Sequence, residues 1–275
     1  MRPRPKLPSS PQAAFKEREE ALRASAALFL RARSWWAGLS ALGPRVVPAR
    51  VPLVAPGDDG IFRPTCALLQ AVAPSAAVPS PDHALRVCSL LRDRAPPVPG
   101  FTDRWVRAEV VLAAGVASPV ERAALLCGFL LGFGLDAFVA VGDAVDGPDY
   151  WCLTRDGEGG VAVWDARRGV RYPSAATARP GATPFRCVHA VIGPGALYVN
   201  GQGSAESPRD AAGVAEALAV LTQRPLLHET GFDLEDPRLW RKYAAEGAEV
   251  AAPLARVSGE LHRGRTGTPA LPGVA

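Results

Sequence analysis

Two pairs of side chains in the second half of the chain have types and spacings that could support chemistry. Cys187 and His189 are two residues apart in an apolar run, which places them on one face of a predicted strand. Together they could supply the nucleophile and the base of a cysteine hydrolase. Asp149 and Asp165 each lie at the end of a predicted strand, and they could bind a divalent cation if a third oxygen ligand were close.

Neither pair is accompanied by the further residues that a catalytic site or a metal site would need. No helix start and no third group orient Cys187 and His189, so the hydrolase is kept as an alternative hypothesis. The two aspartates lack a compact ligand motif, and solvated acids at strand ends are the simpler interpretation. We therefore expect no metal and no cofactor.

The segment that begins at Ser118 has the composition of a strong helix start. Ser118 can accept a hydrogen bond from a free backbone N–H, Pro119 stands where no N–H is needed, and Glu121 can reach back to Ser118. In several enzyme folds this place holds a cysteine, because the free N–H groups and the helix dipole stabilise its thiolate. Here the residue is proline, which has no nucleophilic group.

The apolar pattern around this helix predicts an α+β fold, with a helix packed on an antiparallel meander of strands. A hairpin is expected to turn at Gly57 to Gly60, a helix capped by Asp82 to follow, and another helix to span 102–114. In the main helix, over 120–133, Gly128 and Gly132 would let the adjacent sheet approach closely. The later strands are expected at 137–141, 150–154, 161–164, 185–192 and 196–200, before a helix at 211–222.

The chain divides into four predicted parts. Residues 1–12 form a disordered basic arm, 13–50 an amphipathic helix and a link, 51–245 the folded domain, and 246–275 a disordered tail. In the helix, Phe15, Leu22, Phe29 and Trp36 recur every seven residues. We expect this stripe to lie on the domain, although Trp35 beside Trp36 keeps a helix for a separate partner as an alternative.

Composition narrows the classes of protein. Residues 1–50 hold ten Lys/Arg and three Asp/Glu within a chain whose net charge is +4, so the basic character belongs to the N-terminal arm. Nucleic-acid binding by this arm is a weaker alternative, because no recognition motif accompanies it. The chain has no apolar run long enough for a membrane helix, so no membrane partner is expected. The five cysteines are odd in number and lack CxxC spacing, which favours free buried thiols.

Five stretches in a fixed order resemble a known family. They are GDDGIFRPTC (57–66), ERAALLCGFLLGFGLDAFVAVG (121–142), PDYW (148–151), VWDARRGVRY (163–172) and FDLEDPRLW (232–240). The order is similar to that of the transglutaminase-like, or peptidase-like, domain of the centrosomal 76 kDa protein family and its relative in the axonemal dynein regulatory complex. The resemblance implies a papain-like core.

The resemblance also assigns the positions of the catalytic residues. It places the family's helix start on Ala117, Ser118 and Pro119, with the cysteine at Pro119, the histidine at Asp149 and the acidic residue at Asp165. With only a carboxylate retained, the domain is expected to be inactive. The vacated cleft would be acidic and suited to a basic or amphipathic peptide. Arg122, Tyr150, Trp151 and Trp164 are expected beside it, with Arg122 neutralising part of the charge of Asp149 and Asp165 and the two tryptophans as apolar walls or core supports.

The function that the resemblance implies is structural. We expect a binding or scaffold module with protein partners, located in the cytoplasm at the centrosome, centriole or cilium. Its process would be centriole duplication or axoneme assembly.

Overall fold

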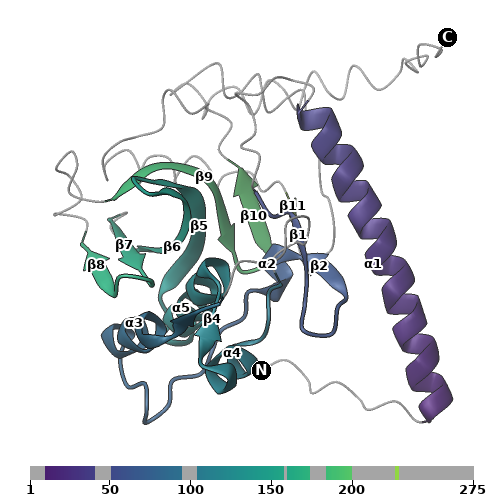
Figure 1. Ribbon diagram of the computed structural model, residues 1–275, viewed down its shortest axis with the longest axis horizontal. Helices are drawn as coiled ribbons and strands as arrows, with labels where there is room; N and C mark the ends of the chain where they lie inside the picture. Colours follow the sequence, from purple (N-terminus) through teal and green to yellow (C-terminus); the bar gives the residue numbers. More distant parts are fainter. Residues whose placement is uncertain are drawn as a thin grey trace.

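A seven-stranded antiparallel sheet is the centre of the fold, in the order β11-β10-β9-β5-β6-β7-β8 (Figure 1). The computed structural model describes residues 10–40, 51–94, 104–157, 160–173, 184–199 and 227–228. The sheet strands are β5 (Asp136–Ala144), β6 (Gly147–Arg155), β7 (Val161–Asp165), β8 (Val170–Tyr172), β9 (Phe185–Gly193), β10 (Ala196–Val199) and β11 (Leu227–His228).

The α+β prediction is confirmed, but the sheet is not a simple meander. Strands β5 to β8 pair in chain order, whereas β9 returns to pair with the free edge of β5. The sequence pattern also missed β8, because a strand of three residues is too short to give a periodic signal.

Five helices are described, all of them outside the sheet: α1 (Pro11–Ser40), α2 (Thr65–Leu68), α3 (Pro81–Leu90), α4 (Ala108–Ala114) and α5 (Pro119–Gly132). The predicted hairpin near Gly57 is formed by β1 (Val54–Pro56) and β2 (Phe62–Pro64). Ser80, rather than Asp82, caps α3, because its hydroxyl accepts a hydrogen bond from the His83 backbone N–H at 3.3 Å. Pro81 then begins the helix, where a missing N–H does no harm.

Helix α5 packs on the sheet and also on the extended segment 70–72. A Cβ added at Gly132 would lie 1.7 Å from the Val72 carbonyl oxygen, and one at Gly128 would lie 2.7 Å from the Gln70 oxygen. The Val72 N–H donates to the Gly128 carbonyl at 2.8 Å. The prediction that these glycines admit a close neighbour is thus correct, but the neighbour is a main-chain segment and not the sheet.

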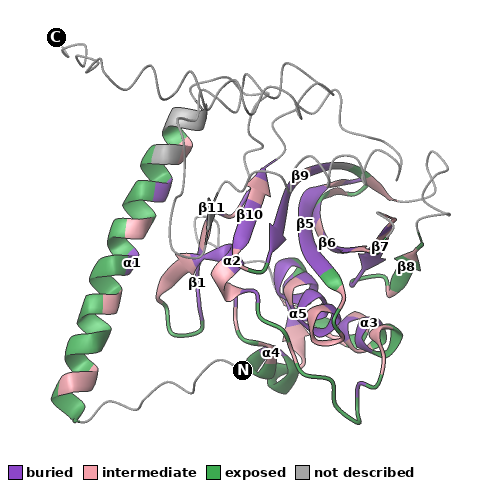
Figure 2. Ribbon diagram, turned by 180° about the vertical axis from the view of Figure 1, so that it is seen from behind, coloured by how far each residue is buried: buried purple, intermediate pink, exposed green. Residues whose placement is uncertain are grey.

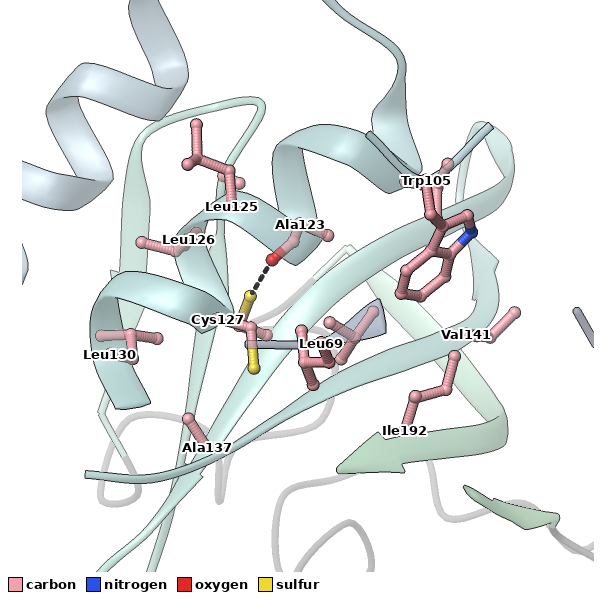
Figure 3. Packing of buried hydrophobic residues seen from close by; sticks show 14 of the residues in the cluster. Leu69, Trp105, Ala123, Leu125, Leu126, Cys127, Leu130, Ala137, Val141 and Ile192 are labelled. Atoms are coloured by element: carbon pink, nitrogen blue, oxygen red, sulfur yellow. Dashed lines mark hydrogen bonds between the residues drawn. The ribbon is translucent and has the colours of Figure 1, made fainter. Parts of the chain in front are cut away.

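Successive residues of β6 enter two different apolar clusters, because side chains alternate between the faces of a strand. Cys152 lies in the larger cluster with Leu126 and Leu130 of α5, part of which is shown in Figure 3. Trp151 and Leu153 lie in the smaller cluster. The sheet is therefore covered by apolar packing on both faces along β6.

Helix α1 contacts the rest of the molecule through one face of its C-terminal half. Ser25 and Ala32 are buried, the Ser25 hydroxyl accepts from the Phe62 backbone N–H at 2.7 Å, and Phe29 packs on the Phe62 ring at 5.1 Å between centroids. Trp36 packs against the larger cluster. The predicted stripe is correct at Phe29 and Trp36 and wrong at Phe15 and Leu22, which are exposed. The N-terminal part of α1 is mostly exposed (Figure 2).

Several predictions fall outside the described residues. These are most of the basic arm 1–12, the helix at 211–222, the segment 232–243 and the tail 246–275. Within the part of the chain that the structure describes, no helix is long and apolar enough to cross a membrane.

Candidate functional site

The start of α5 forms as the sequence predicts. The Ser118 hydroxyl accepts from the Glu121 backbone N–H at 3.3 Å, and the Glu121 carboxylate accepts from the Ser118 backbone N–H at 2.8 Å. Pro119 is the first residue of the helix. This reciprocal cap satisfies two backbone donors, and the proline at that place removes a third donor that would have no helical partner.

A short strand lies beside this helix start. Strand β3 (Arg92–Asp93) pairs in parallel with β4 (Val116–Ala117), which directly precedes Ser118. The backbone N–H of Arg94 donates to the Ala117 carbonyl at 3.0 Å, and the Arg94 guanidinium donates to Glu121 at 2.8 Å. The capping carboxylate of Glu121 therefore has a second, cationic partner.

Arg122 is almost completely buried and depends on the same short strand for its charge partner. Its side chain is 3% exposed and donates to Asp93 at 2.7 Å and to the Cys88 carbonyl at 3.3 Å. Its Nε has no hydrogen-bond partner among the described residues. Arg122 was predicted to neutralise Asp149 and Asp165, but it pairs with Asp93 instead, because it points toward α3 and β3.

Asp149 and Asp165 converge, as predicted, and an arginine lies between them. Arg168 donates to Asp165 at 2.7 Å and to Asp146 at 2.6 Å, and it approaches Asp149 to 4.0 Å. The same Asp165 carboxylate accepts from the backbone N–H groups of Arg167 and Arg168 at 3.0 and 2.9 Å. Asp165 thus stabilises the turn after β7 by accepting these hydrogen bonds. In a catalytic triad the corresponding carboxylate accepts a hydrogen bond from a histidine instead.

The environments of the two carboxyl groups differ. Burial raises the pKa of Asp149, and the charge of Asp165 raises it further, against a lowering by the Tyr150 backbone N–H and by Arg167 and Arg168. The Tyr150 N–H donates to Asp149 at 2.8 Å. A carboxylate cannot form the imidazolium that pairs with a catalytic thiolate, so Asp149 does not supply the cationic partner of a cysteine nucleophile.

The acidic groups at this end of the sheet have cationic partners. Arg94, Arg167 and Arg168 stand beside them, and Arg167 approaches Asp93 to 3.9 Å. These ion pairs within the chain offset part of the negative charge on which the predicted preference for basic peptides depends.

Three of the four side chains predicted to line a cleft belong to the interior. Trp151 and Trp164 are 1% and 2% exposed, and Arg122 is also buried. Trp151 stacks on Phe185 at 4.1 Å between ring centroids, and the Trp164 indole N–H donates to the Thr154 hydroxyl at 2.8 Å. Only Tyr150 is half-buried. The tryptophans are supports of the core rather than contacts for a ligand.

Four cysteines are confirmed as free, buried thiols: Cys66, Cys88, Cys127 and Cys152. The Cys152 thiol donates to the Ala123 carbonyl at 3.1 Å. Burial raises the pKa of both Cys88 and Cys152, so neither thiol forms a thiolate readily. The side chain of Cys187 lies outside the described residues.

His189 has an acidic neighbour that the sequence pattern did not indicate. Its Nε2 lies 2.9 Å from the Asp143 carboxylate. The pairing of β9 with β5 shifts register between Val141 and Gly142, whose partners are Ala190 and Val188. His189 is the residue skipped, so the regular alternation that supported a shared face with Cys187 is interrupted here.

No group of side chains in the described ranges has the composition and closeness of a metal site. Asp58 and Asp59 lie in the β1 to β2 turn, as predicted. The Asp59 carboxylate accepts from the Ile61 backbone N–H at 3.0 Å and from Arg63, while Asp58 pairs with Arg107. Both acids thus have protein partners.

Sequence reasoning missed the residues that hold this site together: Asp93, Arg94, Arg167 and Arg168. Arg168 follows Asp165 by three residues, a spacing that could have indicated their contact in a turn. Asp93 gave no such signal, because its partner Arg122 is 29 residues away.

Comparison with known proteins finds a family similar to part of this chain. Residues 103–212 match the family described as the CEP76 peptidase-like domain. The match lies within the predicted domain 51–245.

Curated relatives point to one kind of protein. The chain is 31% identical over 160 residues to the centrosomal protein of 76 kDa of Danio rerio, and 29% identical to those of Homo sapiens and Mus musculus. Each match covers 57% of this chain and 24% of the relative, so the chain matches about a quarter of the length of these proteins.

Solved structures include similar chains at low identity. Legionella pneumophila LapG, EGTA-treated, is 11% identical with a TM-score of 0.37, covering 52% of this chain and 76% of LapG. The calcium-bound form has a TM-score of 0.37 and covers 50% and 77%.

Proposed function

We propose that this chain is a centrosomal protein whose peptidase-like domain is catalytically inactive and serves as a protein-binding or scaffold module. The observation that carries the proposal is Pro119 at the first position of α5, where the resemblance expects the nucleophilic cysteine. Proline supplies no thiol, and the Ser118 cap shows that the helix start is complete without one.

The charged side chains around this position support the proposal. Asp149 stands where a histidine is expected, and a carboxylate cannot form the cationic partner that stabilises a thiolate. Asp165 is engaged by Arg168 and two backbone N–H groups. The three positions have thus become parts of a helix cap and an ion-pair network.

The relatives support a centrosomal location, since they are named centrosomal proteins of 76 kDa. We propose protein partners at the centrosome, centriole or cilium and a role in centriole duplication or axoneme assembly. The domain would contribute rigid shape and surface rather than chemistry.

Two measurements test inactivity and location separately. A cysteine-directed electrophilic peptide probe should leave the native chain unlabelled. The reason is that the free cysteines among the described residues are all buried: Cys66, Cys88, Cys127 and Cys152. Labelling that disappears in Cys187→Ser would overturn inactivity and revive the hydrolase alternative.

Imaging of the tagged chain against a centriole marker tests location. We expect a centrosomal or ciliary signal for the wild-type chain. The Pro119→Cys variant should show the same location, since the change leaves the Ser118 and Glu121 cap in place. A diffuse signal for the wild-type chain would contradict the proposed location. Capture of partners from the same cells, with Pro119→Cys/Asp149→His as the matched variant, should recover the same proteins from both chains.

A further inference from the structure

A second face of α1 carries a stripe of residues that are exposed in the part of the chain that the structure describes. At about 100° per residue, seven exposed residues lie within a sector of roughly 80°. They are Phe15, Glu19, Leu22, Ala26, Leu30, Arg33 and Ala37. Three are large and apolar, and Phe15, Leu22 and Leu30 are 71%, 45% and 63% exposed.

This stripe borders the face that holds α1 to the domain and is centred away from it. Ser25 and Ala32, which are buried against the domain, lie roughly 110° around the helix from the middle of the stripe. Phe29 and Trp36, which also contact the domain, lie roughly 60° and 80° from it. In Figure 1, α1 stands at the border of the molecule, with β2 against only part of its length. The N-terminal half of the helix is mostly exposed in Figure 2.

The positions of the stripe are spaced symmetrically about Ala26, and the residues at matching positions are chemically complementary. The intervals between the seven positions are 4, 3, 4, 4, 3 and 4 residues, a palindrome centred on Ala26. Reversing the helix therefore places each position opposite another member of the stripe. Such self-complementarity is what a two-fold interface between identical chains requires.

The residues matched by this reversal fit one another. Leu22 meets Leu30 of a second copy, Glu19 meets Arg33, and Phe15 meets the small Ala37, while Ala26 meets its own copy at the two-fold axis. Each pair except the central one occurs twice. Apolar side chains bury one another, opposite charges are matched, and alanine at the axis permits close approach.

We propose that α1 is a dimerisation helix that packs antiparallel against α1 of a second copy of this chain, with the two-fold axis at Ala26. The overlap from Phe15 to Ala37 is about 34 Å long, enough for six turns of helix. The Glu19 to Arg23 pair within one helix does not oppose it, because an exposed pair of this kind contributes little.

Sedimentation equilibrium of the full chain over a concentration series tests the proposal. The wild-type chain is expected to form a dimer, and Leu22→Asp to weaken it by about a hundredfold or more, since two apolar contacts are lost and two charges are buried. Thermal unfolding should show that this variant remains folded, because Leu22 does not belong to the core. A chain that stays monomeric, or a dimer unaffected by Leu22→Asp, would overturn the proposal.

Charge reversal tests the antiparallel register. Glu19→Arg and Arg33→Glu should each weaken the dimer by about tenfold, because two attractive pairs become repulsive, and the double variant should recover it. Glu20→Arg is the matched control, with the same change of charge off the stripe, and should leave the dimer within about twofold of wild type. Failure of the double variant to recover would exclude this register.

Cross-linking locates the axis. Under mild oxidation, Ala26→Cys should yield a disulfide-linked dimer, because the two Ala26 positions face each other, whereas Ala24→Cys, on the opposite side of the helix, should not. The reverse pattern would place the interface on another face.

Discussion

Helices α5 and α1 differ in how much of their surface is buried by the rest of the molecule. Of the 14 residues of α5, ten are buried, whereas Ser25 and Ala32 are the buried side chains described among the 30 residues of α1. Close packing makes each position of α5 depend on atoms from α3, β3, β6 and the segment 70–72. Helix α1 is held through one narrow face, and most residues on its other faces are exposed within the part of the chain that the structure describes.

The start of α5 is stabilised because its buried polar groups are paired. Ser118, Glu121 and Arg122 are all buried there, and each has a partner of matching polarity. A buried polar group without a partner would be costly. Substitutions at this helix start therefore affect packing and hydrogen bonding together.

The largest expected effect tests the packing of α5 against segment 70–72. Gly132→Ala should lower the free energy of unfolding by about 3 kcal/mol or more, because the added Cβ would collide with the Val72 carbonyl. Urea denaturation measures it. The control is Gly157→Ala, where a Cβ would meet no atom within 4 Å, and similar losses in the two variants would mean that segment 70–72 does not pack here.

A buried charge should depend on its partner far more than an exposed one. Asp93→Ala should cost about 2 kcal/mol, because it leaves the buried Arg122 guanidinium without its carboxylate. On α1, Glu19→Ala removes the exposed partner of Arg23 and should cost no more than about 0.5 kcal/mol in the monomer. Chemical denaturation of both variants at one salt concentration makes the comparison, and equal costs would contradict it.

Removal of the helix caps compares the two helix starts directly. Ser118→Ala should cost about 1 kcal/mol, since it leaves the buried Glu121 N–H without an acceptor. Ser10→Ala removes the corresponding bond to the Ala13 N–H, which is exposed and can bond to water instead. Its effect on unfolding of the domain should be close to zero. No loss in Ser118→Ala would mean that the α5 cap does not contribute.

The smallest expected effect concerns how the free energy of unfolding changes with pH. Asp149 and Asp59 should change it in opposite directions. The pKa of Asp149 is raised in the folded chain, so ionisation opposes folding, and stability falls as pH rises from about 4, the usual unfolded value, through the folded pKa. Asp149→Asn should remove this dependence and be at least as stable as wild type at neutral pH.

Asp59 should behave in the opposite way. The hydrogen bond from Arg63 lowers the pKa of Asp59 to about 2, so its ionised form favours folding. Asp59→Asn should therefore be less stable at neutral pH, with the difference disappearing as pH falls from about 4 toward the folded pKa. Denaturation midpoints across this pH range measure both variants, and the same sign for both would contradict the assigned environments.

Local sequence signals were sufficient for the elements and for the helix start. The Ser118, Pro119 and Glu121 pattern specified its own cap, because the bonds of a capping box join residues within one turn. The main strands were predicted to within a few residues, since their apolar runs are long. The positions of Pro119, Asp149 and Asp165 came from the resemblance, and the structure brought the two aspartates together.

What only the tertiary structure decided is which side chains meet across long distances in sequence. The sequence contains Arg122 and Asp93, Cys152 and Ala123, and Gly132 and Val72, but no periodicity relates the members of each pair. Their contacts depend on how α5 is placed against α3, β6 and segment 70–72. Helical periodicity predicted an apolar stripe over Phe15, Leu22, Phe29 and Trp36, whereas the packing of Ser25 and Ala32 decided which residues of α1 remained exposed.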